Sequence, residues 1–249
     1  MALAKQDTNV ERRDANAREI ARPERFPLVS MVLLALTFIG MMISIWMIFL
    51  YAPTDAIEGD AQRIFYFHLP TAILGMLAMG IVTLGGIMYL WKKDERWDWA
   101  ARAAAELGAV LLTFALITGS IWGRTTWGTW WTWDARLTTT LILWFIYIGY
   151  LMLRSYMGRS AASARAGAVL AIIGIIDVPI IYESVNWWRT LHPQQVLPIG
   201  SSPQLPPEML YTLLVSFVTF TLLFSFLMVQ LYQLEKMQTL AQRLRASVE

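Results

Sequence analysis

Residues 64–91 read IFYFHLPTAILGMLAMGIVTLGGIMYLW, a stretch of 28 residues without Asp, Glu, Lys or Arg. About 20 apolar residues suffice for a helix to cross the hydrocarbon core of a bilayer. Residues 209–234 form a second stretch that lacks these four residue types. The whole chain has a mean hydropathy of +0.48 and 57% hydrophobic residues, which is too apolar for an ordinary soluble domain. The sequence therefore predicts a membrane protein.

Four further apolar segments accompany these two, so the predicted fold is an all-α membrane protein with a bundle of six transmembrane helices. The expected spans are residues 27–51, 64–91, 103–122, 137–154, 166–182 and 209–232. The expected division is a cytoplasmic N-terminal tail (1–26), one transmembrane domain (27–232) and a cytoplasmic C-terminal tail (233–249). The first tail carries six Lys or Arg and no apolar segment, unlike a cleavable signal peptide.

The positive charges indicate the orientation of the bundle. Of the 20 Lys and Arg residues, 16 lie in the two tails and around the connections after the second and fourth spans, and four lie in the other connections. Because Lys and Arg accumulate on the cytoplasmic side, both termini are expected in the cytoplasm. The outer face then consists of residues 52–63, 123–136 and 183–208. The last of these loops holds half of the ten prolines and is expected to be irregular.

Composition excludes or disfavours several kinds of site and partner. The chain has no cysteine, which excludes disulfides, thiolate metal sites and attachment of haem through cysteines. The net charge is only +2 and the basic residues form no single patch along the sequence, so nucleic acid is not an expected partner. Any cofactor must be held without cysteine sulfur.

The expected outer loop between the third and fourth spans contains Trp127-Gly-Thr-Trp-Trp-Thr-Trp-Asp134, with four tryptophans in seven residues. An indole offers a large flat apolar surface and one N–H donor. Tryptophans favour membrane interfaces in general, so an anchoring belt is the alternative interpretation. Their density in one connection favours a platform for a wide, flat and largely apolar ligand.

The two histidines of the chain, His68 and His192, are both expected on the outer face, as are Trp187 and Trp188. Either imidazole is also compatible with a plain interfacial position. A zinc site would need three or four ligands at short spacings, which the sequence does not show. Haem needs one axial ligand on each face of its plane, and the two can come from distant segments. Two imidazoles beside an aromatic platform therefore fit haem.

Arginines on the expected outer face are candidates for pairing with the haem propionates, because a guanidinium can donate two parallel hydrogen bonds to a carboxylate. They are Arg63, Arg124, Arg136 and Arg189. Contact with lipid headgroups is the alternative for each of them. Asp177 and Glu106 are expected at membrane depth, where an ionisable residue suggests function. For Asp177 the alternative is a hydrogen bond to a helix near Pro179.

Three motifs of the chain are similar to those of a known family. Residues 127–138, WGTWWTWDARLT, closely resemble the signature of the haem-handling WWD family in the form of its CcmC branch, haem exporter protein C. Residues 63–70, RIFYFHLP, and 185–192, VNWWRTLH, resemble two further motifs of that branch. The similarity runs from about the first span to the sixth and leaves out the N-terminal tail and much of the proline-rich loop.

This resemblance implies a multi-pass protein of the bacterial inner membrane that holds haem b non-covalently at its periplasmic face. It implies delivery of the haem to a periplasmic haem chaperone during cytochrome c biogenesis, which is haem transfer and not the work of a classical enzyme. The implied partners are that chaperone, an ABC-type ATPase with its membrane subunits, and a small single-span subunit. The implied axial ligands of the iron are His68 and His192. The candidate haem-binding set is completed by Trp127, Gly128, Trp130, Trp131, Trp133, Asp134, Arg63, Arg124, Arg136, Trp187 and Trp188.

In the expected mechanism the histidines clamp the iron, the ring edge faces the periplasm, and the loop with His192 loosens on transfer. Two other classes stay open. A membrane b-type cytochrome would move electrons through the same haem, although such proteins usually place more than two histidines deep in their spans. A solute transporter would use Asp177 in its pathway, but it would leave the tryptophan segment unexplained, and no inverted repeat supports it.

Overall fold

The computed structural model describes residues 28–192 and 205–246, and the expected N-terminal tail lies outside them. Six helical segments of the described chain are long and apolar enough to cross a membrane. They are Leu28–Tyr51, Asp60–Lys92, Glu95–Thr126, Ala135–Tyr156, Ala161–Trp187 and Pro207–Ala246. The predicted all-helical architecture with six long apolar helices is confirmed, and the orientation of the helices in the membrane stays a prediction.

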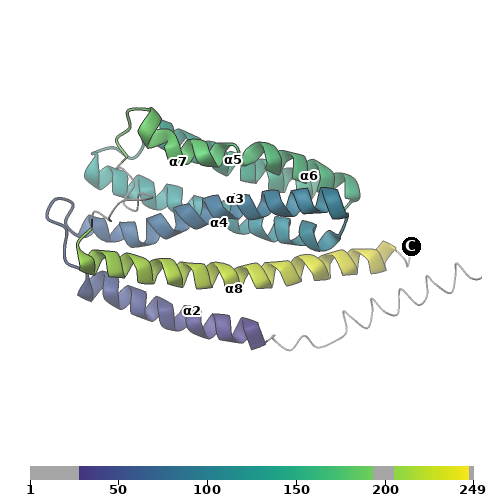
Figure 1. Cartoon of the computed structure of the whole chain (residues 1–249), viewed down its shortest axis with the longest axis horizontal. Helices are drawn as coiled ribbons and strands as arrows, with labels where there is room; N and C mark the ends of the chain where they lie inside the picture. Colours follow the sequence, from purple (N-terminus) through teal and green to yellow (C-terminus); the bar gives the residue numbers. More distant parts are fainter. Residues whose placement is uncertain (1–27, 193–204, 247–249) are drawn as a thin grey trace, which may run out of the picture.

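Several spans contain more than one helical element. The elements in chain order are α2 (Leu28–Trp46), the π-helical turn η1 (Met47–Tyr51), the 3-10 turn η2 (Asp60–Ile64), α3 (Phe65–Lys92), α4 (Glu95–Thr126), α5 (Ala135–Tyr156), α6 (Ala161–Gly174), α7 (Asp177–Trp187) and α8 (Pro207–Ala246). Figure 1 shows them side by side along one long axis. Asp94, Asp134 and Ser160 cap α4, α5 and α6 by accepting a hydrogen bond from a backbone N–H of the first turn.

Helices α3 and α4 form the centre of the bundle. In Figure 1, α8 and α2 lie on one side of this pair, and α5, α6 and α7 lie on the other. Gly75 lets α3 approach α4, because a Cβ at this position would lie 2.7 Å from the side chain of Leu112. Small residues at crossings are the usual means by which membrane helices pack closely. The largest cluster of buried apolar side chains therefore centres on α3, α4 and α5.

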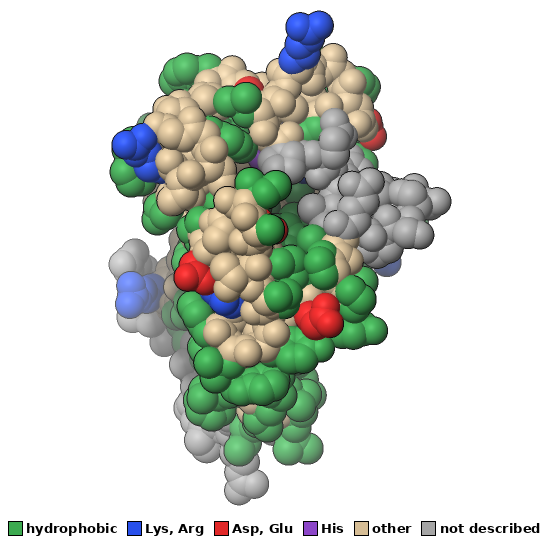
Figure 2. Space-filling model, turned by 90° about the vertical axis from the view of Figure 1, so that its left-hand side faces the viewer, with side chains coloured by type: hydrophobic (Ala, Val, Ile, Leu, Met, Phe, Trp, Pro, Cys, Tyr) green, Lys and Arg blue, Asp and Glu red, His purple; other side chains and the backbone are tan. Residues whose placement is uncertain are grey.

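The two ends of the bundle differ in chemistry. One end, called the histidine end below, carries residues 52–59, the tryptophan loop (residues 127–134) and residues 188–192. Figure 2 looks onto this end, where apolar side chains, other uncharged side chains and backbone cover most of the visible face and charged side chains are sparse. The opposite end, called the far end, carries residues 93–94 and 157–160 and a network of ion pairs.

Buried ion pairs at the far end join α4, α5, α8 and the turn before α6. Arg154, which is 1% exposed, donates to Asp98 at 2.6 Å. Glu235, which is 2% exposed, pairs with Arg102 at 2.9 Å and also with Arg159. Glu235 lies beyond the expected end of the last span at residue 232. Its two ion pairs hold this part of α8 against α4 and the turn before α6. Residues 233–246, expected as part of a tail, accordingly continue α8.

The fifth span is not the single helix that the sequence predicts. It breaks at Ile175 and Ile176 into α6 and α7, and α7 continues to Trp187, into the region expected to be an irregular loop. The physical reason is Pro179, which has no N–H to donate to the carbonyl of Ile175 four residues earlier and whose ring crowds that carbonyl. Helix α7 packs on α5 and scarcely contacts α3, whereas α6 contacts both.

Candidate functional site

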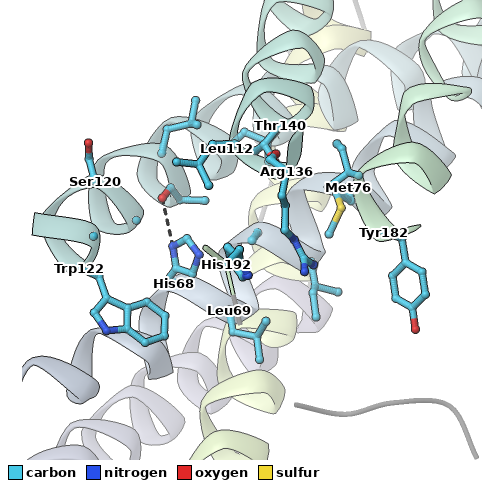
Figure 3. Close-up of a pocket in the computed structure, with 18 of the residues that line it drawn as sticks. His68, Leu69, Met76, Leu112, Ser120, Trp122, Arg136, Thr140, Tyr182 and His192 are labelled. Carbon is cyan, nitrogen blue, oxygen red and sulfur yellow. Dashed lines mark hydrogen bonds between the residues drawn. The ribbon is translucent and has the colours of Figure 1, made fainter. Parts of the chain in front are cut away.

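A cavity of about 680 Å³ lies inside the histidine end of the bundle. Its wall is built from α3, α4, the tryptophan loop, the start of α5, α7 and the segment after α7. The volume lies within the range of roughly 300–1,000 Å³ that is typical of sites for cofactors and small molecules. Both histidines line it. Figure 3 shows His68, His192 and Arg136 extending into the same space.

His68 is held rigidly on the first turn of α3. Its Nδ1 lies 3.1 Å from the carbonyl oxygen of Ala115 and 3.2 Å from Oγ1 of Thr118. Because a carbonyl only accepts, Nδ1 carries the proton, and Nε2 keeps its lone pair. Gly119 makes room for the ring, since a Cβ there would lie 2.9 Å from Cε1 of His68. This is the arrangement in which a histidine is oriented as a metal ligand.

Each histidine has a tryptophan packed edge to face against its ring. Trp122 contacts His68 with 5.8 Å between ring centroids and an interplanar angle of 70°. Trp127 contacts His192 with 6.4 Å between centroids and 62° between planes. Trp122 is fixed in turn by its indole N–H, which donates to the carboxylate of Glu58 at 2.9 Å. The two imidazoles therefore approach the cavity from opposite segments of the chain with similar aromatic support.

The tryptophan loop is an ordered turn between α4 and α5. Gly128 adopts φ +76°, a conformation that side chains rarely tolerate. Ser120 donates to the carbonyl of Trp130 at 2.6 Å, and Asp134 accepts from the backbone N–H of Leu137 at 3.0 Å. Gly128 and Asp134, both in the predicted haem-binding set, thus shape the loop and its junction with α5.

The four tryptophans of this loop do not form one surface. Trp127 and Trp131 line the cavity. Trp130 and Trp133 are 60% and 77% exposed, and with one edge of Trp131 they line a shallow groove on the outside of α4 and α5. Trp187 and Trp188, packed against each other with 5.7 Å between centroids, are also more than half exposed and lie outside the cavity lining.

The arginines named from the sequence occupy different environments. Arg136, half-buried on the first turn of α5, lines the cavity, and its guanidinium makes no hydrogen bond or ion pair within the described chain. Arg63 instead donates to Asp60, to Thr54 and to the carbonyls of residues 48 and 52, which ties the first connection to η1. Arg124 donates to the carbonyl of Gly128, and Arg189 is exposed. Arg136 alone among these four lines the cavity.

Two donors in the cavity wall suit an anionic ligand. The indole N–H of Trp131 is buried and has no hydrogen-bond partner among the described residues. Trp131 lines the cavity, as does Arg136, whose guanidinium carries a positive charge. Unsatisfied buried donors are rare in proteins and call for an explanation. A carboxylate on an otherwise apolar ligand would supply the missing acceptors.

Asp177 is 8% exposed at the start of α7, and its Oδ2 has no hydrogen-bond partner in the described residues. It does not line the cavity, whereas its neighbours Val178 and Pro179 do. No group of three His, Asp or Glu side chains that could hold a metal ion occurs in residues 28–192 and 205–246. The described part of the site therefore suits an apolar ligand that two imidazoles can bind better than it suits a bare metal ion.

Several residues of this site were not among the candidates named from the sequence. Gly119, Ala115 and Trp122 position His68, and Tyr182 and Met76 add to the wall, as Figure 3 shows for the labelled ones. Glycine and alanine are common in membrane helices, so Gly119 and Ala115 do not stand out. The spacing of these two residues, one helical turn on α4, becomes meaningful only when α3 is placed beside them.

Comparison with known proteins agrees with the motifs. The model of the family CcmC, Heme exporter protein C, matches residues 16–247. The Heme exporter protein C of Bradyrhizobium diazoefficiens is 44% identical over 174 residues, which are 70% of this chain and 66% of that protein. That of Haemophilus influenzae is 36% identical over 217 residues, 87% of each protein. That of Escherichia coli K12 is 41% identical over 145 residues, 57% of this chain and 58% of that protein.

The matched stretch thus spans slightly less than two thirds of the length of the first of these relatives and most of the second. A family model that covers nearly the whole chain, together with relatives at about 40% identity, leaves no ambiguity about kinship. The chain belongs to the CcmC, or heme exporter protein C, family.

Proposed function

We propose that this protein binds haem b non-covalently in the cavity, with His68 and His192 as the two axial ligands, and passes it to a periplasmic haem chaperone in cytochrome c biogenesis. One observation carries the proposal. The two histidines of the chain line a single cavity, and Nε2 of His68 makes no hydrogen bond within the described residues, because Nδ1 is the nitrogen bound to Ala115. Imidazole nitrogen is a common axial ligand of haem iron.

The remaining walls suit the rest of the haem molecule. Trp127 and Trp131 line the cavity with flat apolar surfaces that can pack against a macrocycle. Arg136 and the N–H of Trp131 can bind the propionates, since charge-assisted hydrogen bonds to carboxylates are roughly twice as strong as neutral ones. Trp130 and Trp133 lie outside the cavity, where they can contact lipid or a partner.

The two ligands differ in how they are held, which suggests how haem leaves. His68 belongs to a central helix and is bound by Ala115 and Thr118 from α4. His192 follows the end of α7 in an irregular segment, where its backbone N–H donates to Thr190 at 3.1 Å. Loosening an irregular segment disrupts fewer contacts than moving a packed helix, so release begins at His192. A chaperone that binds the iron can then replace this ligand.

The positive-inside rule supports a place for this site at the periplasmic face of the bacterial inner membrane, with both termini in the cytoplasm. The proposed partners are the periplasmic chaperone, an ABC-type ATPase with its membrane subunits, and a small single-span subunit. These partners come from membership in the family. The bundle leaves long apolar faces on α2 and α8 that suit lipid or neighbouring membrane helices.

Absorption spectroscopy tests the proposal. The protein is purified in detergent from haem-replete cells. Spectra are recorded oxidised and reduced for the wild type, His68→Ala, His192→Ala and the control Ile57→Ala, whose side chain is 95% exposed at the histidine end and does not line the cavity. We expect a low-spin spectrum with two nitrogen ligands in the wild type and the control, and its loss in both histidine variants. An unchanged low-spin spectrum in either histidine variant contradicts the ligand assignment.

A second measurement separates haem delivery from electron transfer. The haem-loaded protein is incubated with purified periplasmic haem chaperone, and the two are separated to see which carries the haem. Departure of haem with the chaperone supports delivery. Haem that stays bound through repeated cycles of reduction and oxidation, with no transfer, supports a b-type cytochrome instead.

A further inference from the structure

We propose that the cavity opens sideways between α3 and α7, and that haem enters through this opening from the half of the bilayer nearer the histidine end. The identity of the ligand rests on the proposed function, whereas the opening itself rests on the geometry of the described helices.

One face of α3 forms a continuous wall from the histidine end toward the middle of the bundle. The residues of α3 that line the cavity are Phe65, His68, Leu69, Ala72, Ile73, Met76, Leu77 and Gly80. From His68 to Gly80 the wall covers roughly 18 Å at 1.5 Å per residue. Leu77 lines the cavity and is also 55% exposed on the surface of the bundle. A side chain that faces both sides marks the edge of the opening.

The other edge of the opening is α7. Ile175, Val178, Pro179 and Tyr182 line the cavity, and Pro179 is exposed as well. Helix α7 packs mainly on α5, so α3 and α7 scarcely touch. Helix α6, on the other side of the break, contacts α3 closely.

On the side of the break that faces the far end, α3 and α6 pack closely against each other. Thr83 of α3 donates to the carbonyl of Ala171 at 3.0 Å. At Gly86 a Cβ would lie only 3.0 Å from Cα of Ala168. The two spans therefore touch toward the far end and separate toward the histidine end. The cavity occupies the wedge between them, and Figure 3 shows two of its lining residues, Met76 of α3 and Tyr182 of α7.

The cavity has no continuation toward the far end within the described chain. Leu143 and Tyr147 of α5 are fully buried, and the hydroxyl of Tyr147 donates to the carbonyl of Gly75 at 2.8 Å. Met79 and Val82 of α3, each 1% exposed, fill the next turns. The buried pairs of Arg154 and Glu235 follow at the far end. A wide ligand cannot pass this packed core without its unfolding, since protein interiors are close-packed.

The chemistry along the wall points to an amphiphile with an apolar body and an anionic edge. The charged lining residues Glu58, Arg136 and Glu183 all belong to the histidine end. Deeper in, Met76, Leu77 and the surrounding lining residues are apolar or glycine. A haem dissolved among acyl chains keeps its propionates near the headgroups, so its ring can slide between α3 and α7 while its carboxylates move toward Arg136. A phospholipid acyl chain is the competing occupant of the same space.

Single-cysteine labelling tests the route, because the chain has no cysteine of its own. Leu77→Cys places a thiol at the edge of the opening. Leu84→Cys is the matched control, since Leu84 lies seven residues further on the same face of α3, is 62% exposed and does not line the cavity. Each protein is reconstituted without haem in phosphatidylcholine vesicles, with or without prior reaction with pyrene maleimide. Haem uptake from the vesicle bilayer is followed by absorption.

We expect the label at residue 77 to slow uptake by about tenfold or more relative to the same protein unlabelled, and the label at residue 84 to leave the rate unchanged. Equal uptake rates for labelled and unlabelled Leu77→Cys, in protein that still gives the His68-dependent spectrum, overturn the lateral route and leave the proposed function intact. Failure of the wild type to take up haem at all overturns the proposed function, and the lateral route for haem with it.

A second pair of variants avoids the label. A Cβ at Gly80 or at Gly149 meets no atom within 4 Å, but only Gly80 lines the cavity. Gly80→Phe is expected to slow both the uptake and the release of haem, whereas Gly149→Phe changes neither rate. A barrier at an opening affects entry and exit alike. Unaltered rates in Gly80→Phe contradict the route, and so does a loss of affinity without slower uptake.

Discussion

Replacement of Gly119 by Ala tests how strictly the position of His68 matters. The new Cβ would lie 2.9 Å from Cε1 of the His68 ring, whereas ordinary van der Waals contact begins at 3.4 Å. The ring must therefore withdraw by about half an ångström. Its Nδ1 is held at 3.1 Å by the carbonyl of Ala115, on the same face of α4 one turn earlier. Such a movement takes this hydrogen bond beyond the usual limit of about 3.2 Å.

Overpacking of a well-packed site costs about 1–3 kcal/mol. Because about 1.4 kcal/mol corresponds to a tenfold change in affinity, we expect Gly119→Ala to weaken haem binding by roughly 5- to 150-fold. The measurement is titration of the haem-free protein in vesicles, followed by absorption of the bound haem.

Gly149→Ala is the matched control, since a Cβ there meets nothing within 4 Å and the residue lies outside the cavity lining. Both variants gain the same helix propensity of about 1 kcal/mol, so their difference reports on His68. Equal affinities of the two variants would refute the conclusion that Gly119 sets the position of the ligand.

Three further predictions concern the cavity and the far end. Arg136→Gln should weaken haem binding by about 10- to 150-fold, because a charged hydrogen bond contributes about 1.5–3 kcal/mol. Haem whose propionates are esterified should bind the wild type and Arg136→Gln with equal affinity. A difference in affinity for the ester would contradict the pairing of Arg136 with the propionates. Trp131→Phe should lower haem affinity while keeping the low-spin spectrum, and unchanged affinity in a titration would show that its N–H finds no acceptor in haem. Glu235→Ala should lower the free energy of unfolding by about 3–5 kcal/mol, because it leaves Arg159 without its buried carboxylate. Arg243→Ala is the comparison, because it breaks the exposed pair of Arg243 with Glu95, which should contribute at most about 1 kcal/mol to the free energy of unfolding. Similar unfolding midpoints for Glu235→Ala and Arg243→Ala would contradict a stabilising role of the buried pairs of Glu235.

The spans and the family were predictable from the sequence because both depend on local patterns. Uncharged stretches such as residues 64–91 can only be accommodated in a membrane, and the motif around Trp131 is contiguous in the chain. The boundaries were less predictable. Residues 233–246 carry charges typical of a tail, yet they are helical because Glu235 finds two arginines from α4 and from the turn before α6.

The composition of the site could be predicted only in part. His68 and His192 were recognisable as a rare residue type on one expected face, and the structure brings them to one cavity. The arginines were indistinguishable in sequence, because Arg63 and Arg136 differ only in the atoms around them. Arg63 is occupied by backbone carbonyls, including that of Ile48, fifteen residues earlier, whereas Arg136 faces the cavity.

By itself, the sequence determined that this chain enters a membrane with six spans and carries the motifs of its family, since hydropathy and contiguous motifs are properties of neighbouring residues. The tertiary structure alone decided which tryptophans line the cavity, which of the four candidate arginines lines it, and where the wall between α3 and α7 is open. The reason is that these properties depend on distances between segments far apart in the chain. Helix crossings set those distances, through small residues such as Gly75 and Gly86 and through the break that Pro179 imposes on the fifth span.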